Sequence, residues 1–448
     1  MKKKLLLINP VARYVKRKPI LLKNYVDAPF QPLNLAIIAA LTPDDWEIEI
    51  FDEILEPFSY READLVGITS YTGSAPRAYQ LAQLYRSEGI PVVMGGIHAS
   101  MVPEETQNYV DSVVVGEAEG VWEKVISDFE AGQMQKVYQG ELLPMEGAPI
   151  PRHDLLGPRY KIASVQTTRG CPKDCEFCSV SAFNGRHYRK RPVDEVVDEL
   201  EAVPQRLIFF VDDSFIENNQ ESEERAIALF KGMIDRKLDK RWGCQVSINV
   251  ADNEELLHYA YESGCRLFLM GVESEKEAAL DNLGKKLNLK QRSRYDEIFK
   301  RIHDHKIGIL GTFIFGMDTD TPADLYERAK FIKKSRVDAV QPTILTPLPG
   351  TKLYERFKEE NRLLFTNYPE DWARYDWSDI VYTPAQMSRE QMKKTMIKCW
   401  KSLGNWRTVI SKFIRTLYYT RSLETALTFL NVNYIYRMQY YYERFQGK

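Results

Sequence analysis

Short apolar runs alternate with helical stretches along the first 132 residues. The pattern predicts strands at residues 4–9, 46–51, 64–69, 92–94 and 112–115, and helices at residues 33–41, 75–87 and 120–129. Strands that are separated by helices form a parallel sheet with helices on both faces. We therefore predict a Rossmann-like α/β domain over residues 1–132, with a ligand at the carboxyl ends of its strands.

The same alternation resumes after residue 160. Apolar runs predict six further strands, at residues 163–167, 207–211, 243–249, 267–272, 308–315 and 339–345. Six parallel strands with intervening helices make up three-quarters of a (β/α)8 barrel, in which the chemistry gathers at the carboxyl ends. We predict a partial (β/α)6 barrel over residues 161–375 and a helical C-terminal segment over residues 376–448.

Residues 133–160 break both patterns. Proline and glycine recur through this stretch, at Pro144, Pro149, Pro151, Pro158, Gly140, Gly147 and Gly157. Because these residues interrupt helices and strands, the stretch is predicted to be a linker. As a mobile tether, it would let the first domain face the second.

Composition and charge exclude several classes of protein. The chain has 448 residues, of which 44% are hydrophobic and 28% charged, and its net charge of −2 gives no reason to expect nucleic acid as a partner. Its six cysteines lack paired spacing, and the apolar run at its start is too short for a signal peptide, so we expect a cytoplasmic protein. No stretch approaches the ~18 apolar residues of a membrane-spanning helix.

Three cysteines, Cys171, Cys175 and Cys178, lie within eight residues in a C-x3-C-x2-C pattern. Soft sulfur ligands select iron–sulfur clusters, zinc or copper. A structural zinc site needs four ligands, and the other cysteines are isolated in apolar or helical runs. Three cysteines without a fourth suit a [4Fe-4S] cluster with one iron open to a small molecule. The alternative, three buried thiols, is disfavoured because the loop is polar.

Small residues follow the predicted strands of the first domain. They are Asn9-Pro10, Thr69-Ser70-Tyr71, Gly95-Gly96-Ile97-His98 and Gly116-Glu117-Ala118-Glu119-Gly120. Small residues at strand ends let a ligand approach backbone N–H groups closely. The pattern is not G-x-G-x-x-G, so a dinucleotide is disfavoured.

The cysteine loop, with Phe177 before its last cysteine and the lead-in TTRGCP, resembles that of the radical S-adenosylmethionine (SAM) enzymes. The resemblance extends over about residues 3–350. It implies that the open iron binds the amino and carboxylate groups of SAM, and that reductive cleavage gives methionine and a 5′-deoxyadenosyl radical. It also implies an external electron donor of the flavodoxin or ferredoxin type.

The same resemblance implies the SAM contacts. Asp212 and Asp213 stand where many members carry a Gly-Gly-Glu turn for the methionine ammonium, and either aspartate could instead begin the next helix. Phe177 of the cysteine loop is a further implied contact, as are Gln245 and Ser247, which share one face of their strand. Glu273 lies in a motif similar to the ribose-binding GxES, and the strand with Thr312 and Phe313 would offer backbone amides to adenine.

The runs PVVMGGIHASMVPEE and VDSVVVGEAEG resemble the cobalamin-binding domain that precedes many radical SAM barrels. D-x-H-x-x-G is absent after the first strand, so we predict that no histidine ligates cobalt and that hydrogen bonds of His98 hold its loop. A Rossmann-like domain that binds nothing is the alternative. The implied cobalamin contacts are Asn9, Pro10, Gln31, Leu33, Thr69, Ser70, Tyr71, Gly95, Gly96, His98, Gly116, Glu117 and Glu119.

Two basic stretches remain. Residues 186–191 (RHYRKR) are predicted to be a solvated loop, with a contact to an anionic SAM carboxylate or substrate phosphate as the alternative. Residues 386–448 hold 12 Lys and Arg against three Glu, with many aromatic residues and helical spacing. Such a segment either lies on an anionic membrane or caps the barrel mouth, and in both cases we expect it to shape the substrate side.

Together these features predict a cobalamin-dependent radical SAM enzyme that methylates an unactivated carbon of a lipid, isoprenoid or similar substrate. Cyclisation or carbon–carbon bond formation without methyl transfer, and a peptide, protein or tetrapyrrole substrate, are the alternatives. A radical SAM enzyme without functional cobalamin and a cofactor-binding sensor without turnover are two further classes.

Overall fold

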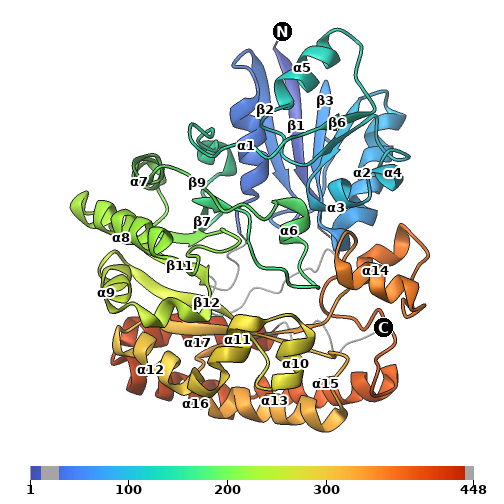
Figure 1. Cartoon of the computed structure of the whole chain (residues 1–448). Helices are drawn as coiled ribbons and strands as arrows, with labels where there is room; N and C mark the ends of the chain where they lie inside the picture. Colours follow the sequence, from blue (N-terminus) through green and yellow to red (C-terminus); the bar gives the residue numbers. More distant parts are fainter. Residues whose placement is uncertain (1, 12–29, 439–448) are drawn as a thin grey trace.

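Two parallel sheets organise the computed structural model of the chain, which describes residues 2–11 and 30–438 (Figure 1). The first sheet has the order β2-β1-β3-β4-β5-β6. All its pairings are parallel, so the predicted Rossmann-like sheet is confirmed. Its strands are β1 (Lys3–Asn9), β2 (Trp46–Asp52), β3 (Leu65–Thr69), β4 (Val92–Gly95), β5 (Ser112–Val115) and β6 (Val137–Gln139).

Helices cover both faces of this sheet because its strands are apolar on both. In β1, Leu6 and Ile8 point into a core with α2, whereas Leu5 and Leu7 pack with α1 and α5 on the other face. The strand order reverses direction between β1 and β3, and ligands of such sheets bind at that point. The helices are α1 (Leu33–Leu41), α2 (Ala75–Ser87), α3 (Ile97–Met101), α4 (Pro103–Thr106) and α5 (Trp122–Glu130).

The stretch predicted as a linker is folded onto the first domain. β6 lies within residues 133–160 and pairs with β5 as an edge strand. Farther along, Arg152 N–H donates to the Ala36 carbonyl at 3.0 Å, and the buried Tyr160 hydroxyl donates to Asp52. These contacts attach the stretch to the first domain at its start and near its end, and Gly147 and His153 contact α7 (Val193–Ala202) of the second domain, so it differs from the mobile tether that its prolines and glycines suggested.

The second sheet is the predicted partial barrel. Its parallel strands follow the order β14-β13-β12-β11-β10-β7, so neighbours in the chain are neighbours in space. The strands are β7 (Ile162–Val165), β10 (Leu207–Phe210), β11 (Arg241–Val246), β12 (Cys265–Glu273), β13 (Gly308–Phe315) and β14 (Ala339–Ile344).

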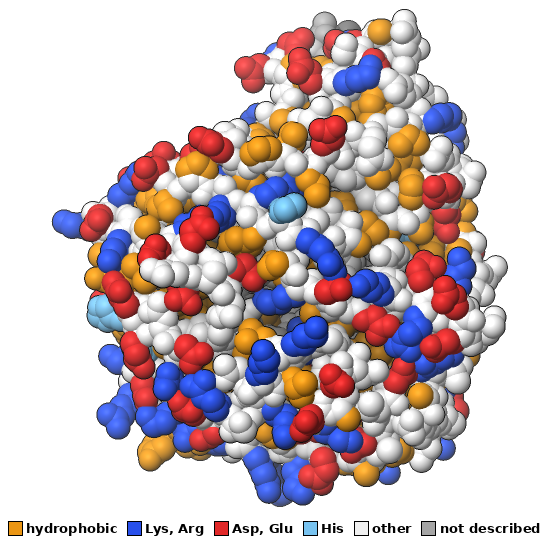
Figure 2. Space-filling view, in the orientation of Figure 1, with side chains coloured by type: hydrophobic (Ala, Val, Ile, Leu, Met, Phe, Trp, Pro, Cys, Tyr) orange, Lys and Arg blue, Asp and Glu red, His pale blue; other side chains and the backbone are white. Residues whose placement is uncertain are grey.

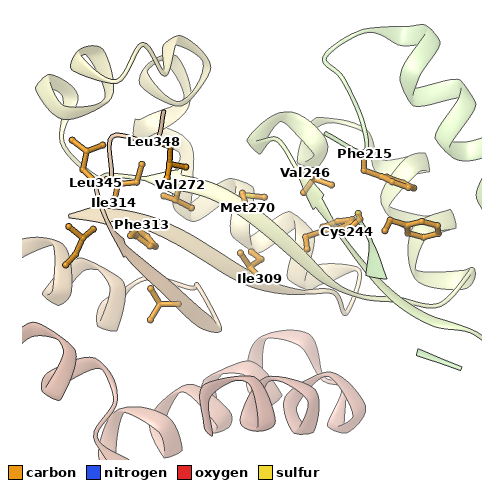
Figure 3. Close-up of a cluster of buried hydrophobic side chains, with 14 of the residues drawn as sticks. Phe215, Cys244, Val246, Met270, Val272, Ile309, Phe313, Ile314, Leu345 and Leu348 are labelled. Carbon is orange, nitrogen blue, oxygen red and sulfur yellow. The ribbon is translucent and has the colours of Figure 1, made fainter. Parts of the chain in front are cut away.

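The outer face of the barrel sheet carries its main core. Side chains such as Cys244, Met270, Ile309 and Phe313 lie in this buried cluster (Figure 3). They pack on the helices α7 (Val193–Ala202), α8 (Gln220–Asp235), α9 (Glu254–Glu262), α12 (Tyr295–Asp304) and α13 (Pro322–Lys334). On the opposite face, Phe429 packs with Leu310 and Ala339 toward the amino ends of the strands, which leaves the carboxyl ends for a ligand.

The cysteine loop begins from a short antiparallel ribbon that the sequence did not predict. β8 (Thr168–Arg169) pairs with β9 (Arg189–Lys190), and the cysteines and α6 (Val180–Phe183) lie between the two strands. The ribbon follows β7, which places the loop at the carboxyl ends of the barrel strands. The location of the loop is therefore the predicted one.

The C-terminal helices close the other end of the barrel. Glu424 of α17 (Leu423–Met438) pairs with Arg241 and Arg266, near the starts of β11 and β12, and Phe429 is fully buried with Leu310 and Ala339. The expectation that this segment caps the barrel mouth or shapes the substrate side is therefore wrong for residues 406–438. α14 (Lys352–Glu359), α15 (Arg389–Leu403) and α16 (Trp406–Thr420) precede α17.

Candidate active site between the two sheets

The three cysteines form one compact loop. Cys178 N–H donates to the Cys175 carbonyl at 3.1 Å, and Cys171 N–H donates to the Gly185 carbonyl at 3.2 Å, which closes the loop on itself. Burial, together with the neighbouring Cys175 and Cys171, raises the pKa of Cys178 to about 11. The Cys178 thiol is thus protonated at neutral pH, and a metal that binds it as a thiolate must displace its proton.

The spacing of these thiols does not suit a single ion. Among the described residues, no three Cys, His, Asp or Glu side chains converge closely enough to hold one metal ion. Zinc binds sulfur at ~2.3 Å and so needs its ligands nearly in contact. The other cysteines are buried elsewhere in the fold. Three thiols in one loop, with the other cysteines buried elsewhere, fit the predicted [4Fe-4S] cluster with one iron not bound by cysteine.

Asp212 and Asp213 hold the cluster loop in place through hydrogen bonds. The buried Asp212 carboxylate accepts N–H groups of Thr167 at 2.6 Å and Thr168 at 2.7 Å. Asp213 accepts from Gly170 N–H at 3.1 Å and from the Asn184 amide at 2.7 Å. The structure therefore ties both aspartates, which the sequence assigned to the SAM ammonium, to the backbone and side chains around the cluster loop.

A third acidic residue, Glu217, has a carboxylate oxygen that remains open. The residue is 4% exposed, and its Oε1 has no hydrogen-bond partner within the described chain. The Lys173 ammonium lies 3.9 Å from this oxygen and donates to the Ser247 hydroxyl. A primary ammonium thus lies between Glu217 and Ser247. The sequence does not identify Glu217, because two adjacent aspartates in the same strand-end loop stand at the position expected to bind the SAM ammonium.

Glu273 is held in an unusual backbone conformation. Its φ is +62°, in the left-handed region, and the register between β12 and β13 shifts at this residue. Non-glycine residues in this region are strained and are found disproportionately at functional sites. The buried carboxylate pairs with Lys285 at 2.8 Å and accepts from the Thr312 hydroxyl at 3.4 Å. The irregularity therefore turns Glu273 toward the predicted SAM side of the strands.

Lys285 is a second residue that the sequence did not single out. Although burial lowers the pKa of its amine, the Glu273 carboxylate and the nearby cysteines raise it above its ordinary value. Its Nζ also lies 5.5 Å from the centre of the Phe177 ring. Lys285 thus brings Glu273, Phe177 and the cluster loop together around one cation.

The remaining predicted SAM contacts differ in whether their side chains are accessible to a ligand. Gln245 has an exposed side chain at the end of β11. Phe313 is fully buried, with its ring 6.2 Å from that of Phe331 on the outer helix α13, and Figure 3 shows it in the core. The Phe313 side chain is thus unavailable to a ligand, which leaves its backbone for the expected adenine contact.

A cavity of about 570 Å³ lies between the two domains. Its wall from the barrel domain includes Gln166, Arg169, Phe183, Val211 and Asp213. From the first domain, it is lined by predicted cobalamin contacts at four strand or helix ends, namely Gln31, Leu33, Thr69, Ser70, Tyr71, Gly95, Gly96, Gly116, Glu117 and Glu119. The cavity therefore brings the strand ends of one sheet to the base of the cluster loop.

The lining of this cavity fits a large ligand with polar groups at its edge. Gln31 Nε2 and Ser70 Oγ are buried and lack hydrogen-bond partners among the described residues. Gly96 has φ +92°, and a Cβ there would lie 2.7 Å from Thr69 Oγ1. Since buried polar atoms are normally paired, the two open groups indicate a ligand with matching donors or acceptors. The amide-bearing corrin ring of cobalamin has such an edge.

Asn9, Pro10 and His98 lie outside the cavity wall. Asn9 donates to Asp52 at 3.0 Å. The 1% exposed His98 places its Nε2 3.1 Å from the Tyr79 hydroxyl, and its ring meets Trp372 edge-on at 5.5 Å. Hydrogen bonding holds the loop of His98, as the sequence predicted. Residues 12 and 13, which complete the position of the missing D-x-H-x-x-G, lie outside the described residues.

The basic run at residues 186–191 is partly buried. Arg189 donates to Glu117 at 2.8 and 2.5 Å, and Arg191 pairs with the fully buried Glu199. The prediction of a solvated loop is wrong for these two arginines, because buried carboxylates on other segments receive them. Arg186 is exposed and pairs with Asp174.

Asp212→Asn should change how stability depends on pH. Burial raises the pKa of Asp212 to about 7, against an ordinary value of 3.8. The carboxyl thus contributes stability below about pH 4 that is lost as the pH rises through 7. An asparagine keeps the oxygen that accepts from Thr167 and Thr168 but carries no charge. Relative to wild type, the variant should gain roughly 1–3 kcal/mol between pH 5 and pH 8.

Thermal unfolding of both proteins across this pH range measures the difference. Asp235→Asn, at an exposed position, is the matched control and should leave the pH profile unchanged. Parallel profiles for Asp212→Asn and wild type would contradict the assignment of this carboxyl.

Within the described ranges, no helix has both the length and the apolar run that a membrane crossing requires.

Comparison with known protein families agrees with the two-domain reading. The model of the Radical SAM superfamily matches residues 165–332, and that of the B12 binding domain matches residues 21–126. The first range covers the cysteine loop and most barrel strands. The second covers the strand ends that line the cavity.

Relatives of known name cover most of the chain. Bacteriochlorophyllide d C-12(1)-methyltransferase of Chlorobaculum tepidum is 31% identical over 396 residues, which cover 85% of this chain and 84% of that protein. Hopanoid C-2 methylase of Rhodopseudomonas palustris is 26% identical over 382 residues, which cover 80% of this chain and 72% of that protein.

Two solved structures share the fold. TsrM from Kitasatospora setae, a radical S-adenosylmethionine methyltransferase with cobalamin and a [4Fe-4S] cluster bound, aligns with a TM-score of 0.66 at 17% identity and covers 90% of this chain and 89% of that chain. The cobalamin-dependent S-adenosylmethionine radical enzyme OxsB aligns with a TM-score of 0.66 at 16% identity and covers 93% and 72%. The family predicted from the cysteine loop and the strand ends is therefore confirmed, and this chain belongs to the radical SAM enzymes that carry an N-terminal B12-binding domain.

Proposed function

We propose that this enzyme transfers a methyl group to an unactivated carbon of an apolar substrate, with a [4Fe-4S] cluster, SAM and cobalamin as cofactors. The observation that carries this proposal is the shared cavity, whose walls are the strand ends of the B12-binding domain and the base of the cluster loop. A methyl carrier in this cavity would lie beside the site where SAM is cleaved. When bound, the cluster supplies the electron for that cleavage and cobalamin carries the methyl group.

The chain's own residues would orient SAM. Cys171, Cys175 and Cys178 hold the cluster, and Glu217 with Ser247 accepts the SAM ammonium in place of the Lys173 amine that lies there now. Lys285 offers a cation beside the cluster loop for the SAM carboxylate, and Glu273 accepts hydrogen bonds from the ribose hydroxyls. Gln245, Thr312 and the backbone of Phe313 complete the proposed site.

The substrate class rests on the cavity and the relatives. Apolar side chains line part of the cavity, including Phe183, Leu348 and Trp377. One relative is named for a hopanoid, an apolar lipid, and this supports a lipid or isoprenoid substrate. The relative with 31% identity is named for a bacteriochlorophyllide, so a tetrapyrrole is the second candidate.

Mass spectrometry can test the reaction directly. The enzyme is purified without oxygen, analysed for iron and cobalt, and incubated with SAM that carries a CD3 group, a reductant, and either a lipid extract or a tetrapyrrole mixture. A product with CD3 in place of hydrogen is expected in the lipid fraction. Labelling in the tetrapyrrole fraction would select the second candidate. 5′-Deoxyadenosine without a labelled product in either fraction would contradict methyl transfer and favour cyclisation or carbon–carbon bond formation.

Glu217→Gln should weaken SAM binding. The substitution removes the charge that would meet the SAM ammonium, and a hydrogen bond to a charged group contributes roughly 1.5–3 kcal/mol, so the dissociation constant should rise by about tenfold or more. SAM titrations followed by the electron paramagnetic resonance of the reduced cluster measure this effect. Glu221→Gln, on the exposed side of α8, is the matched control. Wild-type affinity in Glu217→Gln, with a loss in Asp213→Asn, would return the role to the aspartate.

An external donor of the flavodoxin or ferredoxin type would deliver the electron at the solvent side of the cluster loop. A second hollow of about 380 Å³ reaches Cys175 and Cys178 there, with Arg186 and Lys352 at its edge. Figure 2 shows Lys and Arg side chains interspersed with Asp and Glu side chains around the middle of the face that it draws. Both cations pair with Asp174 in the same hollow, so an acidic donor that docks there would take over these pairs.

The enzyme would work in the cytoplasm and touch an anionic membrane through its C-terminal helices. α16 and the start of α17 expose a stripe of apolar residues with Arg407 and Arg421 beside it. Exposed apolar patches of this kind mark interaction surfaces. The stripe consists of Trp406, Ile410, Ile414, Leu417, Tyr418, Leu423 and Leu427.

Ile414→Asp should reduce binding to vesicles of phosphatidylglycerol and phosphatidylcholine by roughly tenfold, because it places a carboxylate in this stripe. Co-sedimentation with the vesicles measures the change. Ile150→Asp replaces an isoleucine of similar exposure (53% against 58%) and should bind as wild type does. Wild-type protein that fails to sediment with the vesicles, or that forms a dimer in light scattering which Ile414→Asp abolishes, would contradict the membrane contact.

A further inference from the structure

Four charged side chains join the two domains beside the cavity. Arg189 donates to both oxygens of Glu117, at 2.8 and 2.5 Å. Arg169 pairs with Glu119 at 2.6 Å and with Glu117 at 3.4 Å. The glutamates belong to the loop after β5 and the arginines to the β8–β9 ribbon. We call Glu117, Glu119, Arg169 and Arg189 the interdomain ion cluster.

This cluster is shielded from water. The side chains of Glu117, Arg169, Arg189 and Glu119 are 4%, 12%, 12% and 14% exposed. Although burial raises the pKa of Glu117, the two arginines lower it below its ordinary value, so the carboxylate is ionised. The free energy needed to remove these charges from water offsets much of the free energy of their attraction. Such pairs fix the relative position of the segments that carry them more than they add stability.

The ion cluster is built into the base of the iron–sulfur loop. Arg169 precedes Gly170 and Cys171, and it lies opposite Arg189 in the register of the ribbon. The Leu143 carbonyl accepts from Arg189 at 2.6 Å, and Leu143 N–H donates to Glu117 at 3.3 Å. The strand-end loop of the first domain, the connecting stretch and the cysteine loop therefore meet at one carboxylate.

The same residues face the cavity. Glu117, Glu119 and Arg169 all line it. A ligand that fills the cavity therefore contacts side chains whose other partners position the cluster loop. If a ligand at one site restricts these side chains, binding at the other site has less conformational entropy left to lose.

We propose that the interdomain ion cluster couples the two cofactor sites, so that cobalamin in the cavity strengthens the binding of SAM at the cluster loop. Because such linkage is reciprocal, SAM strengthens the binding of cobalamin by the same factor. Arg169 and Glu119 are positioning residues in this coupling. The inference rests on the cofactor assignment of the proposed function but not on its substrate.

Equilibrium dialysis of labelled SAM can test the coupling. The full chain with its reconstituted cluster is measured with and without hydroxocobalamin, and the ratio of the two dissociation constants reports the coupling. We expect a ratio of about tenfold in wild type, within the range typical of coupled sites. In Arg169→Gln and Glu119→Gln the ratio should fall to about one. Arg159→Gln, which removes an exposed ion pair with Glu56, should keep the wild-type ratio.

Two further variants keep the test decisive if a neutral substitution prevents folding or cluster assembly, which iron content and circular dichroism report. Glu119→Asp and Arg169→Lys each keep the charge at their position and should each keep part of the ratio. A wild-type ratio of one would overturn the coupling. So would a tenfold ratio that persists in the two neutral variants. Absence of cobalamin binding would instead overturn the cofactor assignment itself.

Discussion

The carboxyl ends of two parallel sheets meet across one cavity, and every feature of the site depends on this meeting. In each sheet, the strands end in polar or small residues because the chain must turn there into a loop or helix. In the first sheet these ends leave open backbone and the unpaired groups of Gln31 and Ser70. In the second they carry the cysteine loop. Neither set of ends forms the cavity alone.

Acidic residues at the barrel strand ends divide into two kinds. Asp212 and Asp213 are saturated by N–H and amide donors and keep the cluster loop in shape. Glu217 and Glu273 are also buried, but one has an unpaired oxygen and the other a strained backbone. Backbone amides fill the hydrogen-bonding capacity of Asp212, which ties it to the loop, whereas Glu217 Oε1 has no hydrogen-bond partner among the described residues and is the oxygen we propose for a ligand.

The sequence predicts the elements that a local hydrophobic pattern encodes, but not the features that depend on contacts with residues far away in the chain. Strands such as β1 and β13 are predictable because an apolar run buried on both faces has few other solutions. β6 and the β8–β9 ribbon are too short for any periodicity. Helical spacing at residues 409–417 predicts the helix α16, but nothing in the sequence shows that Phe429 of α17 packs inside the barrel at its amino end. The sequence does not single out Glu217, because it does not show which of the neighbouring acidic residues accepts hydrogen bonds from backbone amides.

The contact of Tyr160 with the first domain has a consequence for how closely the two domains are held together. The tyrosine is fastened to the first domain, and β7 of the second begins only two positions later, at Ile162. So short a junction keeps the end of the connecting stretch and the first strand of the barrel close to the first domain, so the two walls of the cavity are held near each other on this side.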